Sequence, residues 1–444
     1  MKLKRKITAL CVLGAVVLSS ACSSSGSGIS YSEGDLTKNV APHGADTLPP
    51  DYDFISSQFD LSLKLFKETV KQSDEPNVMI SPLSVQLALA MTANGADGQT
   101  KDEMMSLLAA GIDPDSLNSY LKGYTDTLPS GDKNKLNIAN SIWIKGSDTI
   151  NVSEQFLQTN VDYYNAKAYK LPFDDDALNM INAWAADNTD GMIKKIVDEF
   201  DGTEIMYLIN AICFDAEWEE QYKDTDVIEN QTFYNYDGSE SKADLMYSVE
   251  GAYFSCVHAT GFIKNYKDNK YGFVGILPNN DIDINEYIAE LKVGGLQDIL
   301  YELNSLDIGH SVIMDSEDDA VNVNNSEVEV YLPKFTSEYG TEMKNILSAL
   351  GMPTAFDSGK ADFSQMGDIM SDGNAYIGSV LHKTYISVDE KGTKASAVTS
   401  VEINNEAAVI APERPIIRLD RPFIYMIIDN DTNLPLFIGT VKNM

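Results

Sequence analysis

The chain is poor in cysteine, histidine and positive charge. Its 444 residues include four cysteines and four histidines, and 33 Lys and Arg stand against 67 Asp and Glu, which gives a formal net charge of −34. Such an acidic surface repels nucleic-acid phosphates, so binding to DNA or RNA is excluded. The 43% of hydrophobic residues is enough for a sizeable core.

The sequence also lacks the motifs of common catalytic and metal sites. No CxxC, HExxH, GxSxG or GxxxxGK[ST] pattern occurs, and no two histidines have the helical spacing of a metal site. Asp174, Asp175 and Asp176 are adjacent, and adjacent carboxylates cannot all face one ion, so a solvated turn is predicted instead of a Ca²⁺ site. We therefore expect no catalytic residue, metal or cofactor, and a chain that is not an enzyme.

The first 21 residues predict export. A basic start is followed by an apolar run over 7–17 that is too short to span a bilayer permanently. Small residues before Cys22 resemble a bacterial lipobox, although Ser19 stands where that motif more often has Leu. We expect 1–21 to be a lipoprotein signal peptide and Cys22 to carry the lipid, which places the protein outside the cytoplasm on a membrane anchor at the cell surface. The alternative is an ordinary cleaved signal with a free Cys22.

The region after the signal divides into a linker and a folded part. Residues 22–50 are rich in Ser, Gly and Pro and predict a flexible tether, with one domain over 51–444. Cys213 and Cys256 lie in apolar sequence and are interpreted as buried small hydrophobes. One disulfide between them stays an open alternative.

Helical and strand patterns beyond residue 50 are mixed, without regular βαβ alternation. Apolar stripes or runs predict helices near 51–70, 84–92, 181–193 and 343–350. Alternating or continuous apolar runs predict strands at 136–144, 205–214, 271–277 and 328–332, and a final hairpin of 423–429 and 436–441. The acidic, Asn-rich stretch 315–326 is interpreted as a solvated surface insertion. These patterns predict an α+β fold.

One segment, 390–411, has an unusual pattern. Every second residue from Thr393 is small or β-branched and uncharged, through Ala395, Ala397, Thr399, Val401 and Ile403. The residues between them are mostly polar, which predicts a strand with one buried face. Gly392 gives this strand a flexible start. The alternation alone is equally typical of an ordinary core strand.

The alternation fails after Ile403, where Asn404, Asn405 and Glu406 are polar in succession. Residues 404–412 are polar and then apolar, with neither a helix nor a strand pattern. This part is interpreted as an exposed bait.

The segment resembles the hinge and reactive-centre loop of the serpins, and the resemblance extends over about 51–444. It is carried by several separated motifs in the family's order: 77–104, 208–218 (LINAICFDAEW), 330–335 (VYLPKF), 421–423 (RPF) and 435–439 (PLFIG). It implies a serpin-like α+β fold of mixed β-sheets with surrounding helices and an exposed reactive-centre loop.

The resemblance also implies roles for single residues. The matched positions are Glu390, Gly392, Thr393, Ala395 and Ala397 in the hinge, Trp218 in the breach where insertion begins, and Ser81, Ser84, Asn210 and His382 in the polar shutter. For His382 the alternative is a solvated histidine at a strand end. Family hinges usually carry Glu where Lys394 stands, but Lys394 would point outward.

The mechanism implied by the resemblance is that of a suicide substrate. A serine endopeptidase cleaves the loop, the cut loop inserts into a β-sheet, and the acyl-enzyme is trapped. Counting from Glu390 as in the family places the reactive bond at Glu406–Ala407, with Ala407–Ala408 and Ala408–Val409 next, whereas counting back from the RPF motif points nearer to residue 411. Small aliphatic bait predicts an elastase-like target, and Glu406 suits a glutamate-specific one. A monomer is expected.

Three other interpretations of the function are alternatives to peptidase inhibition. A non-inhibitory serpin would be a binding or structural protein at the cell surface, and bulky or charged residues on the buried hinge face would favour it. An enzyme built on the same shell would need a site that the sequence does not show. A nutrient-binding lipoprotein fits the N-terminus equally well but not the hinge and breach motifs.

Overall fold

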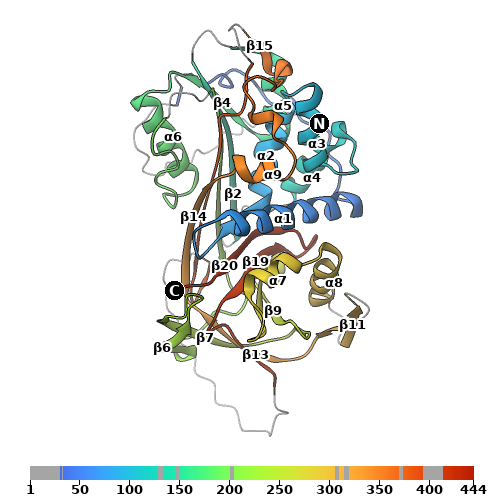
Figure 1. Ribbon diagram of the computed structural model, residues 1–444, viewed down its shortest axis with the longest axis vertical. Helices are drawn as coiled ribbons and strands as arrows, with labels where there is room; N and C mark the ends of the chain where they lie inside the picture. Colours follow the sequence, from blue (N-terminus) through green and yellow to red (C-terminus); the bar gives the residue numbers. More distant parts are fainter. Residues whose placement is uncertain are drawn as a thin grey trace, which may run out of the picture.

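The computed structural model describes residues 31–32, 34–128, 134–146, 150–200, 205–305, 310–314, 320–369, 374–393 and 414–444. Within these ranges, three larger β-sheets and a two-stranded one pack with α-helices (Figure 1). In that view, the long strands of the first sheet run vertically, with α6 on one side and α2 to α5 on the other. This confirms the predicted α+β class.

The first sheet, called sheet A, contains the candidate functional site. Its strands, in spatial order, are β14 (Phe335–Glu342), β16 (Ser379–Val388), β17 (Gly392–Thr393), β5 (Met206–Glu217), β2 (Asn134–Lys145) and β4 (Lys167–Leu171). At one end β5 pairs in parallel with β16 from Ser379↔Tyr207 to Lys383↔Ala211. At the other end β17 lies between these two strands and is antiparallel to both. Sheet A is therefore split at one end around the first two residues of the predicted loop strand.

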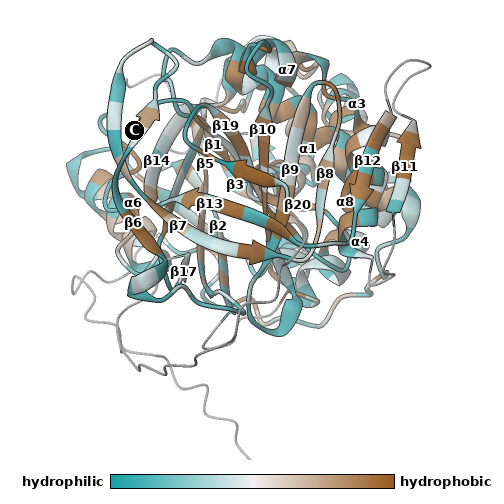
Figure 2. Cartoon of the chain, turned by 90° about the horizontal axis from the view of Figure 1, so that it is seen from below, coloured by the Kyte–Doolittle hydropathy of each residue, from teal (hydrophilic) through white to brown (hydrophobic). Residues whose placement is uncertain are grey.

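Sheet B forms the core of the molecule. Its strands, in spatial order, are β1 (Met79–Ile80), β20 (Pro435–Val441), β19 (Phe423–Asp429), β10 (Tyr271–Pro278), β9 (Ala259–Asn265), β8 (Tyr253–Ser255), β12 (Ala320–Asn324) and β11 (His310–Met314). Every residue of β10, β19 and β20 is buried, and Figure 2 shows β10 and β19 as hydrophobic strands inside a more hydrophilic outer layer. The predicted C-terminal hairpin is confirmed by the antiparallel pairing of β19 with β20.

Strand β12 corrects the expectation of a solvated insertion over 315–326. Val321 and Val323 are buried, and β12 pairs with both β8 and β11. The alternate valines give the segment one apolar face, which the acidic and Asn-rich composition hides. Residues 315–319 lie outside the described part.

Sheet C receives the chain after the predicted loop. It consists of β18 (Ile416–Arg418), β13 (Val328–Pro333), β7 (Glu240–Glu250) and β6 (Val227–Tyr234), and β15 (Gly367–Ile369) pairs separately with β3 (Ile150–Val152). Short 3₁₀ turns occur at Asp224–Asp226, Lys267–Asn269, Thr354–Phe356 and Ser364–Met366. Strand β18 is parallel to β13. Residues 394–413 therefore connect sheet A to sheet C.

The described ranges contain nine α-helices, six of which begin at a side-chain cap. They are α1 (Tyr52–Gln72), α2 (Pro82–Ala93), α3 (Gly98–Leu108), α4 (Pro114–Asp126), α5 (Glu154–Tyr164), α6 (Asp175–Asn188), α7 (Ile284–Glu290), α8 (Val293–Asn304) and α9 (Lys344–Ala349). Asp51 caps α1 by accepting a hydrogen bond from the Phe54 amide. None of the helices in the described ranges is both long and apolar enough to cross a membrane.

Helix α6 starts and ends earlier than the predicted helix over 181–193. The Asp174 side chain accepts from the Ala177 amide, and Asp175 and Asp176 lie in the first turn. Carboxylates are favourable there because the helix N-terminus presents unpaired N–H groups and positive charge. The aspartate run is thus a helix start, where a solvated turn was predicted.

Part of the predicted tether is packed against the domain. The Leu36 amide donates to Ala168 at 2.8 Å, the Lys170 amide donates to Gly34 at 2.8 Å, and the Leu48 amide donates to Ser119 at 3.0 Å. These bonds place residues 34–48 along β4 and α4. A flexible tether therefore does not describe this part of 22–50, while residues 22–30 lie outside the described ranges.

Candidate functional site: the base of the loop and the split of sheet A

The chain makes a tight turn at 389–392 just before the predicted loop strand. The Asp389 amide donates to the Gly392 carbonyl at 2.9 Å, and the Asp389 carboxylate accepts from the Lys391 amide at 2.8 Å. Trp218 holds the turn from outside: its amide donates to the Lys391 carbonyl at 2.8 Å and its indole Nε1 to the Asp389 carbonyl at 2.9 Å. The position of the loop base is thus fixed by the residue expected at the breach.

Strand β17 is the first part of the loop strand, and it already lies in sheet A. Thr393 pairs with Ala216 of β5 and Val388 of β16, its exposed fraction is 0%, and its hydroxyl is 2.6 Å from that of Tyr266. A Cβ added at Gly392 would lie 1.9 Å from the Ala216 carbonyl oxygen. Gly392 is therefore required by close backbone approach, beyond the flexibility expected from the sequence.

Behind the loop base lies an aromatic cluster with a buried ion pair. Trp218 stacks on Tyr266 with ring centroids 4.4 Å apart. Lys264 of β9 donates to Glu250 of β7 at 2.8 Å, and its ammonium lies 4.6 Å from the Tyr222 ring and 5.6 Å from the Trp218 ring. The side chains of Lys264 and Glu250 are 4% and 12% exposed, so this ion pair is shielded from water. It joins sheets B and C beneath the breach.

A second ion pair fastens Glu390. Its carboxylate accepts from Lys334 at 2.7 Å, and both side chains are about one-third exposed. Burial raises the pKa of Glu390, but the hydrogen bond and charge of Lys334 outweigh this, and the net pKa is lowered. Because water screens such a pair, its contribution to stability is about 1 kcal/mol or less.

The predicted shutter residues lie beneath the closed end of the split. His382 of β16 is 3% exposed, so it is not a solvated residue at a strand end. Its Nε2 accepts from the Ser81 amide at 3.0 Å, and the Ser81 hydroxyl caps α2 by accepting from the Ser84 amide at 3.4 Å. Asn210 of β5 is the parallel-sheet partner of His382, although its side chain lies outside the described part. The structure thus brings these four positions together where β5 meets β16.

Burial lowers the pKa of His382 from 6.5 to about 4, so the neutral imidazole accepts the Ser81 bond at neutral pH. The unfolded chain binds a proton on this residue below pH 6.5, whereas the folded chain does so only near pH 4. Stability therefore falls as pH drops through this window, by about 2–3 kcal/mol between pH 7 and pH 4.5.

His382→Asn, which keeps an acceptor but does not titrate, isolates this effect. We expect the thermal midpoint of the wild type to fall further between pH 7 and pH 4.5 than that of the variant. Parallel decreases in both proteins would contradict the assignment.

The family model described as serpin (serine protease inhibitor) matches residues 56–444. This chain belongs to the serpin family. Membership supports a protease-inhibitor function in general, and serpins are generally not catalysts themselves.

Two crystal structures of tengpin, a thermophilic serpin, are similar to this serpin. The native state aligns with a TM-score of 0.83 at 43% identity, covering 92% of this chain and 99% of tengpin. The latent state aligns with a TM-score of 0.74 at 41% identity, covering 90% of this chain and 100% of tengpin. The predicted serpin fold is therefore confirmed, and its arrangement is nearer to the native than to the latent state of tengpin.

Two further relatives are less similar in sequence. Neuroserpin of Homo sapiens is 28% identical over 398 residues, covering 86% of this chain and 90% of neuroserpin. An uncharacterized serpin-like protein of Thermococcus kodakarensis is 29% identical over 384 residues, covering 85% and 83%.

Several predicted residues of this serpin fall outside the described ranges. They are Cys22, Ala395, Ala397, Glu406, Ala407, Ala408 and Val409. Their assignments stay predictions. Cys213 is buried and Cys256 is partly buried, and no disulfide joins them.

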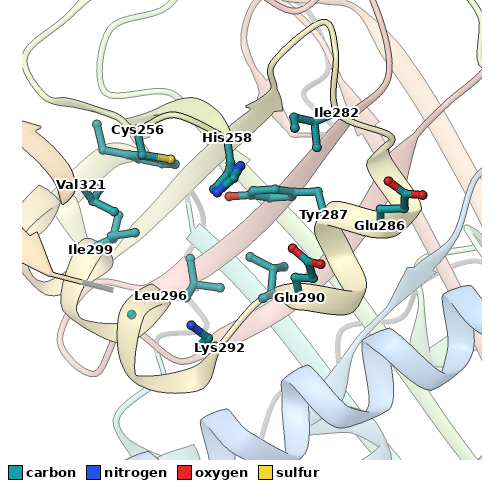
Figure 3. Close-up of a pocket in the computed structure, with 13 residues that line it drawn as sticks. Cys256, His258, Ile282, Glu286, Tyr287, Glu290, Lys292, Leu296, Ile299 and Val321 are labelled. Carbon is teal, nitrogen blue, oxygen red and sulfur yellow. The ribbon is translucent and has the colours of Figure 1, made fainter. Parts of the chain in front are cut away.

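A cavity of about 460 Å³ lies between α7, α8 and β12 (Figure 3). It is a place where the enzyme hypothesis could find an active site. Cys256 and His258 both line it, a pair of residue types used in nucleophilic catalysis. The Cys256 thiol accepts from the Ala259 amide at 3.3 Å and donates to the Ala259 carbonyl at 3.4 Å, and Figure 3 shows the His258 ring beside Tyr287. The Cys256 thiol is hydrogen-bonded to the backbone of its own turn, and this geometry does not support the enzyme hypothesis.

The sequence did not reveal the partners that hold the loop base. Lys264, Glu250, Tyr266 and Lys334 act through contacts between residues far apart in the chain, such as Lys334 with Glu390. Lys334 does lie within the VYLPKF motif, which was the available signal. The other signal was Lys264, the one charged residue of strand β9.

Proposed function

We propose that this serpin inhibits serine endopeptidases as a suicide substrate whose cleaved loop inserts between β5 and β16. The observation that supports this most strongly is the position of Thr393. It already forms one rung between these strands, and its side chain faces the core. Insertion extends an existing strand, so a new one does not have to be nucleated.

The registers on the two sides of β17 agree on where the rest of the loop goes. Thr393 is opposite Ala216 on β5 and Val388 on β16. Moving six residues along an antiparallel strand places Thr399 opposite Asn210 and, on the other side, His382. These two residues are partners in the closed sheet. The inserted strand thus fits between them without a bulge.

The length of sheet A matches the predicted bait. In this register the strand reaches residue 403 where β5 begins at Met206. Glu406, on the amino side of the predicted reactive bond, falls just past the end of the sheet. From Thr393 to Glu406 are 13 residues at roughly 3.3 Å each, so a peptidase held at Glu406 moves by about 40 Å.

Insertion must open the parallel pairing between β16 and β5. That pairing covers Ser379–Lys383 and Tyr207–Ala211. Its hydrogen bonds are replaced by two antiparallel ladders with the new strand, and alternate apolar side chains become buried. The exchange is downhill because more backbone groups are paired and more apolar area is covered after insertion than before.

The proposed target is an elastase-like or glutamate-specific peptidase. The bond Glu406–Ala407 and its neighbours Ala407–Ala408 and Ala408–Val409 offer small aliphatic residues, and no Lys or Arg occurs over 396–413. A lipid on Cys22 would hold the inhibitor, as a monomer, at the cell surface. Recovery of the mature chain in a soluble cytoplasmic fraction would contradict that location.

The test mixes the full chain with an elastase-like, a glutamate-specific or a trypsin-like serine peptidase, followed by a denaturing gel and mass spectrometry. Trapping gives a covalent band of summed mass and a released C-terminal peptide that fixes the bond. Glu406→Gln should abolish trapping of the glutamate-specific peptidase and leave an elastase-like one trapped. Clean cleavage by the first two peptidases without a covalent band would overturn the proposal.

A further inference from the structure

A second cavity, of about 790 Å³, lies where α1, α7 and the C-terminal segment meet. The last two turns of α1 contribute Lys67 and Lys71, α7 contributes Asn285 and Ile288, and Lys442 lies directly after β20. Helices α1 and α7 run next to one another in Figure 1. The site is separate from the split of sheet A.

The wall of this cavity contains a buried cation with a neutral partner. Lys442 is 5% exposed, and its ammonium donates to the Asn285 side-chain oxygen at 2.7 Å. It also lies 5.6 Å from the Tyr236 ring. An ammonium has three donors, and within the described residues that of Lys442 donates one hydrogen bond, to an amide oxygen. Buried charges are normally paired with an opposite charge, because removing an ion from water is costly.

A second lysine in the same cavity is arranged in the same way. Lys67 donates to the carbonyl oxygens of Ala289, at 3.1 Å, and of Leu291. Burial lowers the pKa of both Lys67 and Lys442, with the charges of Asp60 and Asp283 opposing this only in part. Two cations bound to neutral oxygens thus face one cavity in a chain with a net charge of −34.

The other charged groups that line the cavity are either exposed or already paired. Lys71 is exposed and pairs with Glu68 at 3.0 Å. Asp74, Glu75 and Asp237 also line the cavity but are exposed. The inner wall therefore offers positive charge beside the apolar surface of Val70 and Ile288.

We propose that this cavity binds a small carboxylate with an apolar body, with the carboxylate at Lys442 and the apolar part against α1 and α7. The ligand would complete the hydrogen bonding of a shielded ammonium, which gives a strong, charge-assisted bond. The apolar body would cover Val70 and Ile288. The site is independent of the inhibitor function.

The test uses the full chain and two probes of the same size, 1-naphthoate and 1-naphthylmethylamine, with binding measured by calorimetry at low salt. We expect naphthoate to bind at least tenfold more tightly than the amine. Lys442→Met should weaken the affinity for naphthoate by about tenfold or more. Lys71→Met removes a cation that is already paired with Glu68. This variant should change the affinity for naphthoate by less than about twofold.

Thermal unfolding gives a second readout and shows that each variant is folded. Naphthoate should raise the midpoint of the wild type and leave that of Lys442→Met unchanged. Without a ligand, Lys442→Met should not be less stable than the wild type, because it removes a buried charge. The proposal is overturned if naphthoate does not bind, if the amine binds as tightly, or if the two lysine variants lose equal affinity.

Discussion

Exchanging Lys394 and Ala395 is expected to convert this serpin from an inhibitor into a substrate. The double change, Lys394→Ala with Ala395→Lys, keeps composition and net charge constant and moves the cation by one position. In a strand, one position is the difference between the two faces of the sheet. If the register of β17 continues on insertion, residue 394 would come opposite Asp215 and Ser387, which are half-exposed, and residue 395 opposite Phe214 and Ile386, which are buried.

The cost of the exchange comes from burying an unpaired ammonium between Phe214 and Ile386. That burial costs several kcal/mol, enough to slow insertion by a factor of 1,000 or more if the transition state includes it. The peptidase still finds the same bait, so cleavage at the reactive bond continues. The acyl-enzyme then hydrolyses before the loop has inserted.

The measurement is the number of loop molecules cleaved per peptidase trapped, read from a denaturing gel. The wild type and the conservative variant Lys394→Arg should both trap. The exchanged variant should be cleaved completely without a covalent band. Trapping by the exchanged variant at the wild-type ratio would show that residue 395 does not enter the core.

Lys264→Met is expected to destabilise the native protein by about 3–5 kcal/mol, because it leaves the Glu250 carboxylate buried without its cation. The structure places that carboxylate 2.8 Å from the ammonium in a site that is almost closed to water. The change also removes the cation from the faces of Tyr222 and Trp218. Trp218 holds the loop base, so its hold on Lys391 and Asp389 should weaken.

The matched control is Lys264→Met combined with Glu250→Gln. Removing both charges relieves the unpaired carboxylate, and the double variant should recover at least half of the lost stability. Midpoints of urea unfolding, followed by tryptophan fluorescence, provide the comparison. If the single and double variants are equally unstable, the loss comes from packing of the lysine stem and not from the ion pair.

The alternation over 393–403 was the most informative pattern in the sequence, because a period of two determines which side chains share a face without any knowledge of the partners. The structure shows Thr393 on the core face. The apolar runs that became β5, β10, β19 and β20 were also predictable, because strands buried in a core are apolar throughout.

The features that were missed depend on contacts that are distant in sequence or on composition that misleads. The Ser- and Gly-rich N-terminal segment was predicted to be a tether, but backbone hydrogen bonds, which need no particular side chain, hold residues 34–48 to the domain. Strand β12 was hidden in an acidic stretch because only two valines carry its apolar face. The Lys264–Glu250 pair could not be predicted, because residues 14 apart on different sheets meet only in the folded structure.

The most direct test of the account is hydrogen exchange of the protein after cleavage of the Glu406–Ala407 bond. If the cleaved loop inserts, amides over 394–403 become strongly protected, because they join ladders with β5 and β16 on both sides. Protection should be greatest near Thr399, opposite Asn210 and His382. If these amides exchange as rapidly after cleavage as before it, the loop does not insert and the proposed inhibitory mechanism is wrong.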